Sequence, residues 1–203
     1  MRRILQIIIC LGVMTAVQSV QARSIPPLEG LEALRKALGG ISDFTAEISQ
    51  EKRLSLMKRT MTMAGTIRFR KPDLFYMEIG PPYSSRMVLR DGTVEQVIGN
   101  STERTRIVLP PEQGLKRWFS RFSSPITSLP EGMGVTADLA GQVYTVSIVP
   151  SGRGQVQELT IVFLVDGTIK KLIIAEQNGD RSTMIFRKVV RNSGLRDKDF
   201  RID

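Results

Sequence analysis

The sequence predicts a predominantly β-structured α+β domain, in which a curved antiparallel sheet of about eleven strands forms an unclosed half barrel with helices over an apolar cavity. Three observations favour this class. Most segments alternate apolar and polar residues, Asp-Gly and Asn-Gly pairs separate neighbouring segments at hairpin spacing, and two segments carry apolar stripes at helical spacing. A long antiparallel meander curls rather than staying flat, so we expect both helices to cover its concave side as a lid.

The first 22 residues have the pattern of a cleaved secretory signal. Two arginines precede an apolar run over residues 4–17, and residues 20–22 give a small-x-small ending. We therefore expect cleavage after Ala22. Because no internal repeat or linker divides the remainder, we expect one mature domain over residues 23–203.

Side chains that are missing from the mature domain restrict its chemistry. The only cysteine of the chain is Cys10, inside the expected leader, and the sequence has no histidine. Serine triads, thiol nucleophiles, His-ligated metals and redox dithiols are thereby excluded. We expect neither a cofactor nor a metal, and binding is favoured over catalysis.

The charge of the chain narrows the class of partner. Lys and Arg number 29 against 20 Asp and Glu, which gives a formal net charge of +9. The basic residues are scattered and do not form an aromatic-interleaved basic motif, so we expect no nucleic-acid partner. Anionic membrane surfaces, lipid headgroups or an acidic partner protein fit this charge better.

The mature domain is predicted to begin with one helix and two strands. Apolar residues recur at helical spacing over residues 28–38, until Gly39-Gly40 ends the helix. The period changes to two from Phe44 onward, and a second alternating segment runs over residues 61–70. We expect this strand to stop at Lys71-Pro72, because proline cannot donate to a strand ladder.

Short alternating segments predict the remaining strands, and one segment predicts a second helix. The strands are expected at residues 74–79, 86–90, 94–98, 104–109, 135–139, 143–149, 156–165, 168–176 and 181–191. The helix is expected over residues 115–122, where leucine and aromatic side chains share one face.

The segment from Leu74 to Ile79 is apolar on both of its faces. Phe75 and Met77 share one face with Ile79, whereas Leu74 shares the other with Tyr76. A strand of this kind needs a cover on each side. We expect one face to belong to the core and the other to be available to a ligand or partner.

An adaptable apolar lining is predicted from the clustering of methionines and aromatic residues. The flexible thioether of methionine suits a surface that takes guests of varied shape, although ordinary core filling is the alternative. The candidate lining residues are Phe44, Ile48, Met61, Met63, Ile67, Phe69, Phe75, Met77, Met87, Leu115, Trp118, Phe119 and Phe122. Lys71 follows Phe69 on the same parity, where a cation can hold a lid through carbonyl oxygens or meet an anionic headgroup.

Four stretches of the sequence resemble a known family. They are FTAEISQ at residues 44–50, GTIRFRKPDLF at 65–75, VLRDG at 88–92, and the closing STMIFRKVVRNSGLRDKDFRID at 182–203. In these stretches the chain resembles the LolA-type carriers, periplasmic proteins that ferry outer-membrane lipoproteins. The resemblance extends over nearly all of the mature chain.

The resemblance implies an eleven-stranded unclosed barrel without cofactor or catalysis. It implies a periplasmic carrier whose cavity shields lipoprotein acyl chains, received from an inner-membrane ATP-driven transporter and passed to an outer-membrane acceptor; we expect a monomer. The arginine that fastens the lid in this family matches Lys71, with Arg70 beside it as a second latch or headgroup residue.

The chain departs from the family pattern at three points. Lysine at position 71 cannot reproduce the bidentate fork of arginine. The turn at Asp91-Gly92 is followed by Val94-Glu95-Gln96, where the family commonly has an aromatic residue, and the surface is basic. These departures leave the cargo open between a lipoprotein and another lipid.

Two other functions are compatible with the sequence. One is an accessory module that docks a membrane transporter through its apolar sheet face. The other is a secreted hydrolase that uses a carboxylate pair, either Glu47 with Glu51 or Asp73 with Glu78.

Overall fold

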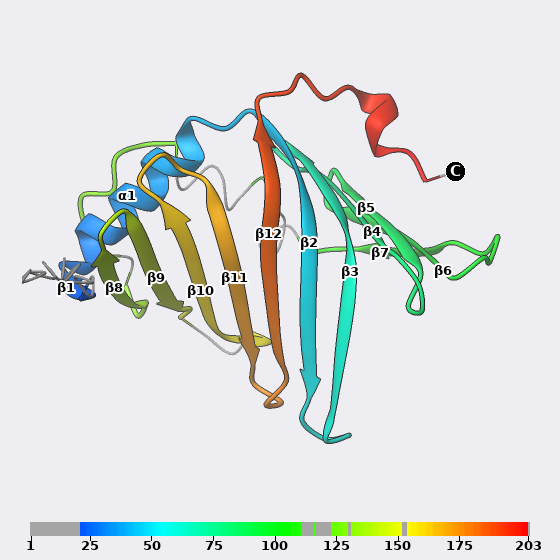
Figure 1. The fold of residues 1–203 in the computed structure, drawn as a ribbon, viewed down its shortest axis with the longest axis horizontal. Coiled ribbons are helices and arrows are strands. Elements are labelled where there is room, and N and C mark those ends of the chain that lie inside the picture. The colour runs from blue at the N-terminus through cyan, green and yellow to red at the C-terminus, as the bar shows by residue number, and fades with distance from the viewer. Residues whose placement is uncertain (1–20, 111–115, 117–122, 130, 152–153, 203) are drawn as a thin grey trace, which may run out of the picture.

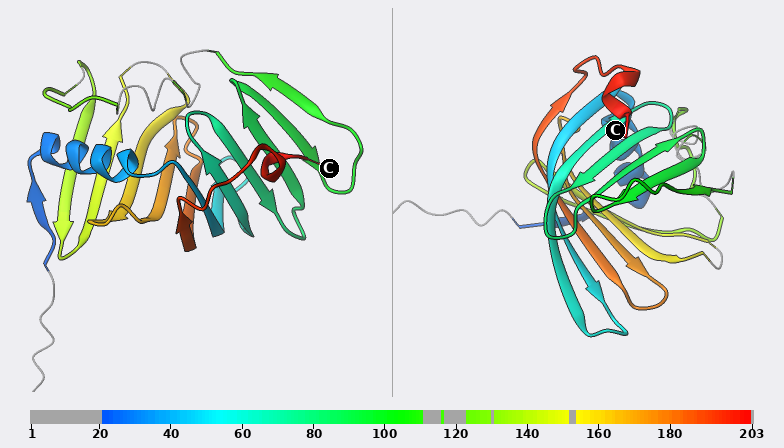
Figure 2. Two further views of the ribbon diagram at one scale, coloured as in Figure 1. Left: turned by 90° about the horizontal axis from the view of Figure 1, so that it is seen from above. Right: turned by 90° about the vertical axis from the view of Figure 1, so that its right-hand side faces the viewer.

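The computed structural model describes residues 21–110, 116, 123–129, 131–151 and 154–202. Within these residues, twelve strands form one sheet that curves strongly and does not close (Figures 1 and 2). Every neighbouring pair of strands is antiparallel. The predicted class, a curved and unclosed antiparallel sheet with α-helical cover, is confirmed.

The strands are β1 (Arg23–Ile25), β2 (Asp43–Leu54), β3 (Arg59–Arg70), β4 (Leu74–Ile79), β5 (Ser85–Arg90), β6 (Thr93–Ile98), β7 (Thr105–Val108), β8 (Gly134–Ala140), β9 (Val143–Val149), β10 (Val156–Leu164), β11 (Ile169–Glu176) and β12 (Arg181–Arg191). Their order across the sheet is β1-β8-β9-β10-β11-β12-β2-β3-β4-β5-β6-β7. The chain therefore builds one half of the sheet from β2 to β7 and the other from β8 to β12, with β1 added at the edge beside β8. The pair β12–β2 joins the halves at the centre.

The sequence predicts most of these boundaries. Helix α1 spans Pro27–Gly39, and β3 ends directly before Lys71-Pro72. Strand β1 is an addition, because main-chain pairing with β8 defines it rather than an alternating pattern. The 3₁₀ helix η2 (Asp197–Phe200) is a second addition. The predicted helix at residues 115–122 lies, apart from Lys116, outside the described residues.

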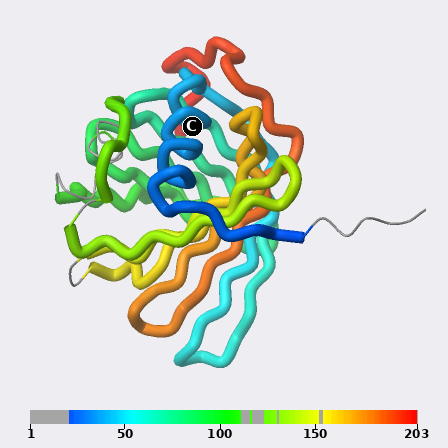
Figure 3. The backbone as a smooth tube through the Cα atoms, turned by 90° about the vertical axis from the view of Figure 1, so that its left-hand side faces the viewer, coloured from blue at the N-terminus to red at the C-terminus, as the bar shows by residue number. Residues whose placement is uncertain are grey.

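Helix α1 lies inside the curve of the sheet, over β8 and β9 (Figure 3). Its buried side chains Leu31 and Leu34 pack in one cluster with Ala137 and Val146. Gly30 makes this close approach possible, since a Cβ atom there would lie 2.2 Å from the Cβ atom of Ala137. Among the described residues, no helix combines the length and the apolar character needed to cross a bilayer.

The C-terminal segment covers the opposite, outer face of the sheet. Its cluster consists of Leu74, Tyr76, Val88, Val97, Phe200 and Ile202. Arg68 donates to the backbone oxygen of Asp199 at 2.7 Å, and its guanidinium lies 4.9 Å from the centre of the Tyr76 ring. Both faces of β4 are therefore covered, which explains why residues 74–79 are apolar on both parities.

A buried polar cluster ties the start of β2 to the chain that leaves β12. Asp43, only 4% exposed, accepts hydrogen bonds from the backbone N–H and hydroxyl of Ser193, at 2.7 and 2.9 Å, and from the backbone N–H of Gly194 at 3.1 Å. The side chain of Asn192 accepts from the Ser42 backbone at 2.8 Å and donates to Gly40 O at 3.0 Å. The end of α1 is thus joined to the same cluster.

Hydrogen bonding decides the charge state of Asp43. Burial raises the pKa of this carboxyl group, but the hydrogen bonds from Ser193, Gly194 and the backbone of Leu195 outweigh it, so the pKa lies below the ordinary value of 3.8. A carboxylate that accepts several N–H bonds keeps its charge in the folded protein, and the cluster depends on that charge.

Asp43→Asn is expected to lower the free energy of unfolding at neutral pH by about 1–3 kcal/mol, because the new amide nitrogen cannot accept from the buried donors. The carboxylate's contribution is fully present above the unfolded pKa of 3.8 and is lost as pH falls through the lower folded pKa. The difference between variant and wild type should therefore shrink in acid. Urea unfolding at several pH values measures it, with Asp91→Asn in an exposed turn as control. An equal difference at neutral and acid pH would contradict this account.

Candidate functional site

The register of the sheet defines one continuous inner face, on which α1 lies. Directly paired residues of antiparallel strands point to the same side, so the face can be followed from strand to strand. From β9 to β12 it carries Val146, Ile161, Leu172 and Met184. Across the central pair Phe186 faces Ile48, and from β2 to β5 the face carries Ile48, Ile67, Met77 and Met87.

All the candidate lining residues that the structure describes lie on this inner face. They are Phe44, Ile48, Met61, Met63, Ile67, Phe69, Phe75, Met77 and Met87. Those near the middle of the sheet, such as Ile67, are buried, whereas the methionines and Phe75 are only half-buried. A guest molecule on this face would meet these half-buried side chains first. The other candidates, Leu115, Trp118, Phe119 and Phe122, lie outside the described residues.

The second half of the sheet adds residues that the sequence analysis did not select. Leu172, Met184 and Phe186 lie on the inner face and contact the cluster that contains Phe44 and Ile48. The signal was present, because residues 168–176 and 181–191 alternate. The alternation predicts the strands, but a period of two does not reveal which distant strand completes the face.

Lys71 links the corner after β3 to the end of α1. Its ammonium group lies 2.6 Å from Leu38 O and 3.2 Å from Gly39 O, the last carbonyls of the helix. A cation at this end also interacts favourably with the helix dipole. Burial lowers the pKa of Lys71. The side chain thus ties one end of α1 to the sheet through main-chain oxygen atoms.

Arg70 does not share the position of Lys71, contrary to the expectation that the two residues form one latch. Its guanidinium lies on the outer face, where it donates to Leu195 O at 3.1 Å and to the carboxylate of Asp197. Successive strand residues point to opposite faces, so neighbours in sequence serve different covers. Arg70 holds the C-terminal segment, not α1.

The middle of α1 is held by a second polar group. Arg35 donates to Glu32 through two nitrogens, each at 2.7 Å, and the backbone N–H of Ile126 donates to Glu32 at 3.2 Å. The hydrogen bond from Arg35 is the largest of the effects that lower the pKa of Glu32 to about 2. Helix α1 is therefore fastened at its middle by Glu32 and at its end by Lys71.

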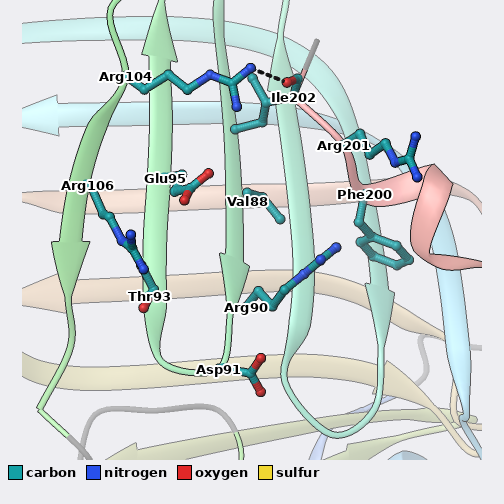
Figure 4. A pocket seen from close by; sticks show the side chains of 10 residues that line it. All are labelled: Val88, Arg90, Asp91, Thr93, Glu95, Arg104, Arg106, Phe200, Arg201 and Ile202. Atoms are coloured by element: carbon teal, nitrogen blue, oxygen red, sulfur yellow. Dashed lines mark hydrogen bonds between the residues drawn. The ribbon is translucent and has the colours of Figure 1, made fainter.

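Two hollows flank the covered faces, and both have charged walls. One, of about 410 Å³, lies beside α1 and is lined by residues that include Glu29, Lys36, Tyr144, Phe163 and Asp166. The other, of about 420 Å³, lies on the outer face beside Phe200, with Arg90, Arg104, Arg106 and Arg201 around it and Asp91 and Glu95 between them (Figure 4). Arg104 donates to Ile202 O across this hollow at 2.8 Å. Neither is the apolar cavity that the sequence predicts.

On the inner face, α1 covers β8 and β9, and aromatic side chains of neighbouring strands pack against one another. The rings of Phe44 and Phe69 lie 5.5 Å apart, and the rings of Tyr144 and Phe163 stack at 5.2 Å. An apolar guest would meet the half-buried side chains first, and it would have to part these ring contacts to go deeper. Within the described ranges, the helix that covers this face is α1, which rests on one half of the sheet.

The carboxylate pairs considered for hydrolysis do not have the geometry of a catalytic dyad. Glu47 and Glu51 are four strand residues apart, about 13 Å, whereas paired catalytic carboxylates stand about 5–10 Å apart. Asp73 lies in the turn before β4, and Glu78 is four strand residues beyond Leu74, again about 13 Å along the strand. Glu47 is also bound by Lys188 at 2.7 Å. Within the described ranges, no cluster of three or more His, Cys, Asp or Glu side chains is placed to hold a metal.

Residues 40–203 match the family model described as outer membrane lipoprotein carrier protein LolA. The chain belongs to the LolA family. The resemblance seen in the sequence is confirmed, and this match contains β2 to β12, Lys71 and the C-terminal segment. A search of curated protein sequences gave no match to this LolA-family chain.

Solved structures that are similar to this LolA-family protein share little sequence with it. They include the LolA superfamily protein NE2245 from Nitrosomonas europaea, with 7% identity, a TM-score of 0.46, and coverage of 88% of this chain and 98% of that one. A putative outer membrane lipoprotein-sorting protein domain from Vibrio parahaemolyticus has 13% identity, a TM-score of 0.43, and coverage of 86% and 95%. A chain of the Pseudomonas aeruginosa MucA/MucB complex has 13% identity, a TM-score of 0.49, and coverage of 87% and 61%.

Lys71→Ala is expected to loosen the end of α1, because two helix carbonyls lose a charged donor. The cost is about 1–2 kcal/mol, so backbone amides in the last turns of α1 should exchange with solvent about tenfold faster. Hydrogen exchange measured by mass spectrometry tests this. Lys71→Arg should retain most of the protection, and Lys170→Ala on the exposed side of β11 is the control. If amide exchange in Lys71→Ala equals that of the wild type, the Lys71 contact does not stabilise the end of α1.

Proposed function

We propose that this protein is a periplasmic carrier that shields the acyl chains of a lipoprotein, or of a related lipid, on the inner face of its sheet. In this proposal the leader is removed after Ala22, an inner-membrane ATP-driven transporter loads the monomeric carrier, and an outer-membrane acceptor unloads it. The protein binds and releases its cargo without catalysis. Membership in the LolA family supports this role, and so does the arrangement of the inner face.

The observation that carries the proposal is an apolar face of which α1 covers only one half. The half-buried residues Met61, Met63, Phe75, Met77 and Met87 line the part of the face away from α1. Methionines adapt to chains of different length and branching at low cost. We propose that these side chains contact the acyl chain and that Lys71 is the latch of the cover.

The energetics suit a carrier rather than a permanent store. Burial of a methylene group stabilises binding by about 0.8 kcal/mol, so about ten buried methylenes offer roughly 8 kcal/mol. A guest that needs more room must displace contacts of α1, including those of Leu31 and Leu34. Return of the helix to the sheet then competes with the guest and assists release.

A cation placed on the inner face should impair acyl binding. Met77→Lys and, separately, Met87→Lys are each expected to weaken binding of a fluorescent fatty acyl probe to the delipidated mature protein by tenfold or more, because the probe would have to desolvate the ammonium group. Thr66→Lys places the same charge on the exposed outer face of β3 and serves as the matched control. Unfolding midpoints show whether each variant is folded.

The carrier role fails if the wild-type protein binds neither the acyl probe nor a triacylated lipoprotein above background. It also fails if both inner-face variants are folded and bind the probe as the wild type does. Lipids that co-purify with the protein from its own periplasm, identified by mass spectrometry, would name the cargo.

Gly30→Ala tests whether α1 is the cover. A Cβ atom at position 30 would lie 2.2 Å from the Cβ atom of Ala137, so the helix must shift away from β8. We expect a loss of about 1–3 kcal/mol of stability and faster association with the acyl probe. Gly39→Ala, where nothing lies within 4 Å of the new atom, is the control. Slower or unchanged association in a folded Gly30→Ala protein would argue against α1 as the gate.

A further inference from the structure

The hairpin between β2 and β3 carries a feature that the carrier function does not use. β2 and β3 are the longest strands of the sheet, with 12 residues each, and their hairpin extends beyond the neighbouring strands (Figure 1). At its tip Leu56 is 90% exposed and Met57 is 68% exposed. Single exposed apolar side chains are ordinary, but two adjacent ones at the end of the longest hairpin form a contiguous apolar tip.

Basic residues surround this tip. Residues 52–59 contain Lys52, Arg53, Lys58 and Arg59 and no acidic residue. The cations lie on both faces of the hairpin, because Arg53 points outward whereas Lys52 pairs with Met61 of the inner face. Arg181 of β12 pairs with Arg53 and adds a fifth cation beside the tip. The apolar end thus has positive charges on both faces of the hairpin.

The neighbouring hairpin holds the tip in place. The backbone N–H of Ser55 donates to the side chain of Asp180 at 2.8 Å, and the N–H of Lys58 donates to Ser55 O at 3.2 Å. Gly179, with a φ angle of +84°, lies so close that an added Cβ atom would be 3.0 Å from Ser55 Oγ. The carboxylate of Asp180, in the adjoining turn, accepts this hydrogen bond from the tip. Leu56 and Met57 are therefore presented outward by a supported turn.

We infer that the β2–β3 tip docks the protein on an anionic lipid bilayer. Leu56 and Met57 enter the interfacial region, and the surrounding cations bind the anionic headgroups. An apolar end with cations on both faces of its hairpin matches the two layers of a membrane surface in both polarity and charge. A protein partner would need an apolar pocket with an acidic rim. The exposed apolar tip and its cations need only an apolar layer beneath anionic headgroups, which a bilayer supplies. This docking goes beyond the proposed carrier function, and neither depends on the other.

Sedimentation of the mature protein with lipid vesicles tests the inference. The protein should bind vesicles rich in phosphatidylglycerol, bind phosphatidylcholine vesicles much more weakly, and lose affinity as salt is raised. Leu56→Ser combined with Met57→Ser should lower partitioning at least tenfold. Lys58→Asn should lower it about fivefold, and asparagine tolerates the positive φ angle of 48° at this position.

Matched controls exist at the opposite end of the sheet. Val165→Ser removes an aliphatic side chain that is 54% exposed, and Lys170→Gln removes one exposed cation; neither should change partitioning. Leu56→Cys labelled with an environment-sensitive dye should shift to the blue on anionic vesicles, whereas labelled Val165→Cys should not. The label is specific because Cys10 lies in the expected leader.

Four outcomes would overturn the inference. They are absence of wild-type binding to anionic vesicles, equal binding to both kinds of vesicle, unchanged binding of the Leu56 and Met57 double variant, and attachment of the tip to a protein partner without vesicle binding. The inner-face variant Met77→Lys separates the two proposals. This variant should bind vesicles as the wild type does, although it should bind the acyl probe weakly. Loss of acyl binding can therefore be distinguished from loss of vesicle binding.

Discussion

The pairing of β12 with β2 is the constraint on which the rest of the structure depends. It brings together residues more than a hundred positions apart and joins the two halves of the sheet, with Phe186 opposite Ile48. A slip of one residue in this pair would put Phe186 and Ile48 on opposite faces and break the inner face in two. Asp43 fixes the register where β2 begins, because its buried carboxylate binds Ser193 and Gly194 just beyond β12.

The two faces of the sheet are covered in different ways. On the outer face, Arg68 and Arg70 of β3 and Arg104, just before β7, donate to backbone oxygens of the C-terminal segment, and Phe200 is 1% exposed beneath it. On the inner face, α1 covers one half of the sheet and is tied by Glu32 and Lys71. Each cover therefore combines a buried apolar cluster with a few hydrogen bonds to main-chain atoms.

Local sequence patterns predict where the strands lie, but they do not predict which distant strands pair. The alternation over residues 61–70, the stop at Lys71-Pro72 and the Asp91-Gly92 turn are properties of neighbouring residues, and the structure has them. The addition of Phe186 to the inner face depends on a strand pair that no local signal specifies. The sequence indicated that Tyr76 needs a cover, yet it could not show that Phe200 provides it. Strand parity separates Arg70 from Lys71, so Arg70 meets the C-terminal segment although the two residues are adjacent in sequence.

The unclosed sheet has a mechanical consequence. A closed barrel has a circumference fixed by its strand number and shear. Here the described sheet ends at β1 on one side and β7 on the other, so no ladder of hydrogen bonds joins its two margins. Changes in twist can therefore widen or narrow the space inside the curved sheet without breaking a hydrogen bond between strands. The width of the space inside the curve is therefore not set by strand number, and a bound molecule of larger or smaller cross-section would require only a change in the curvature of the sheet.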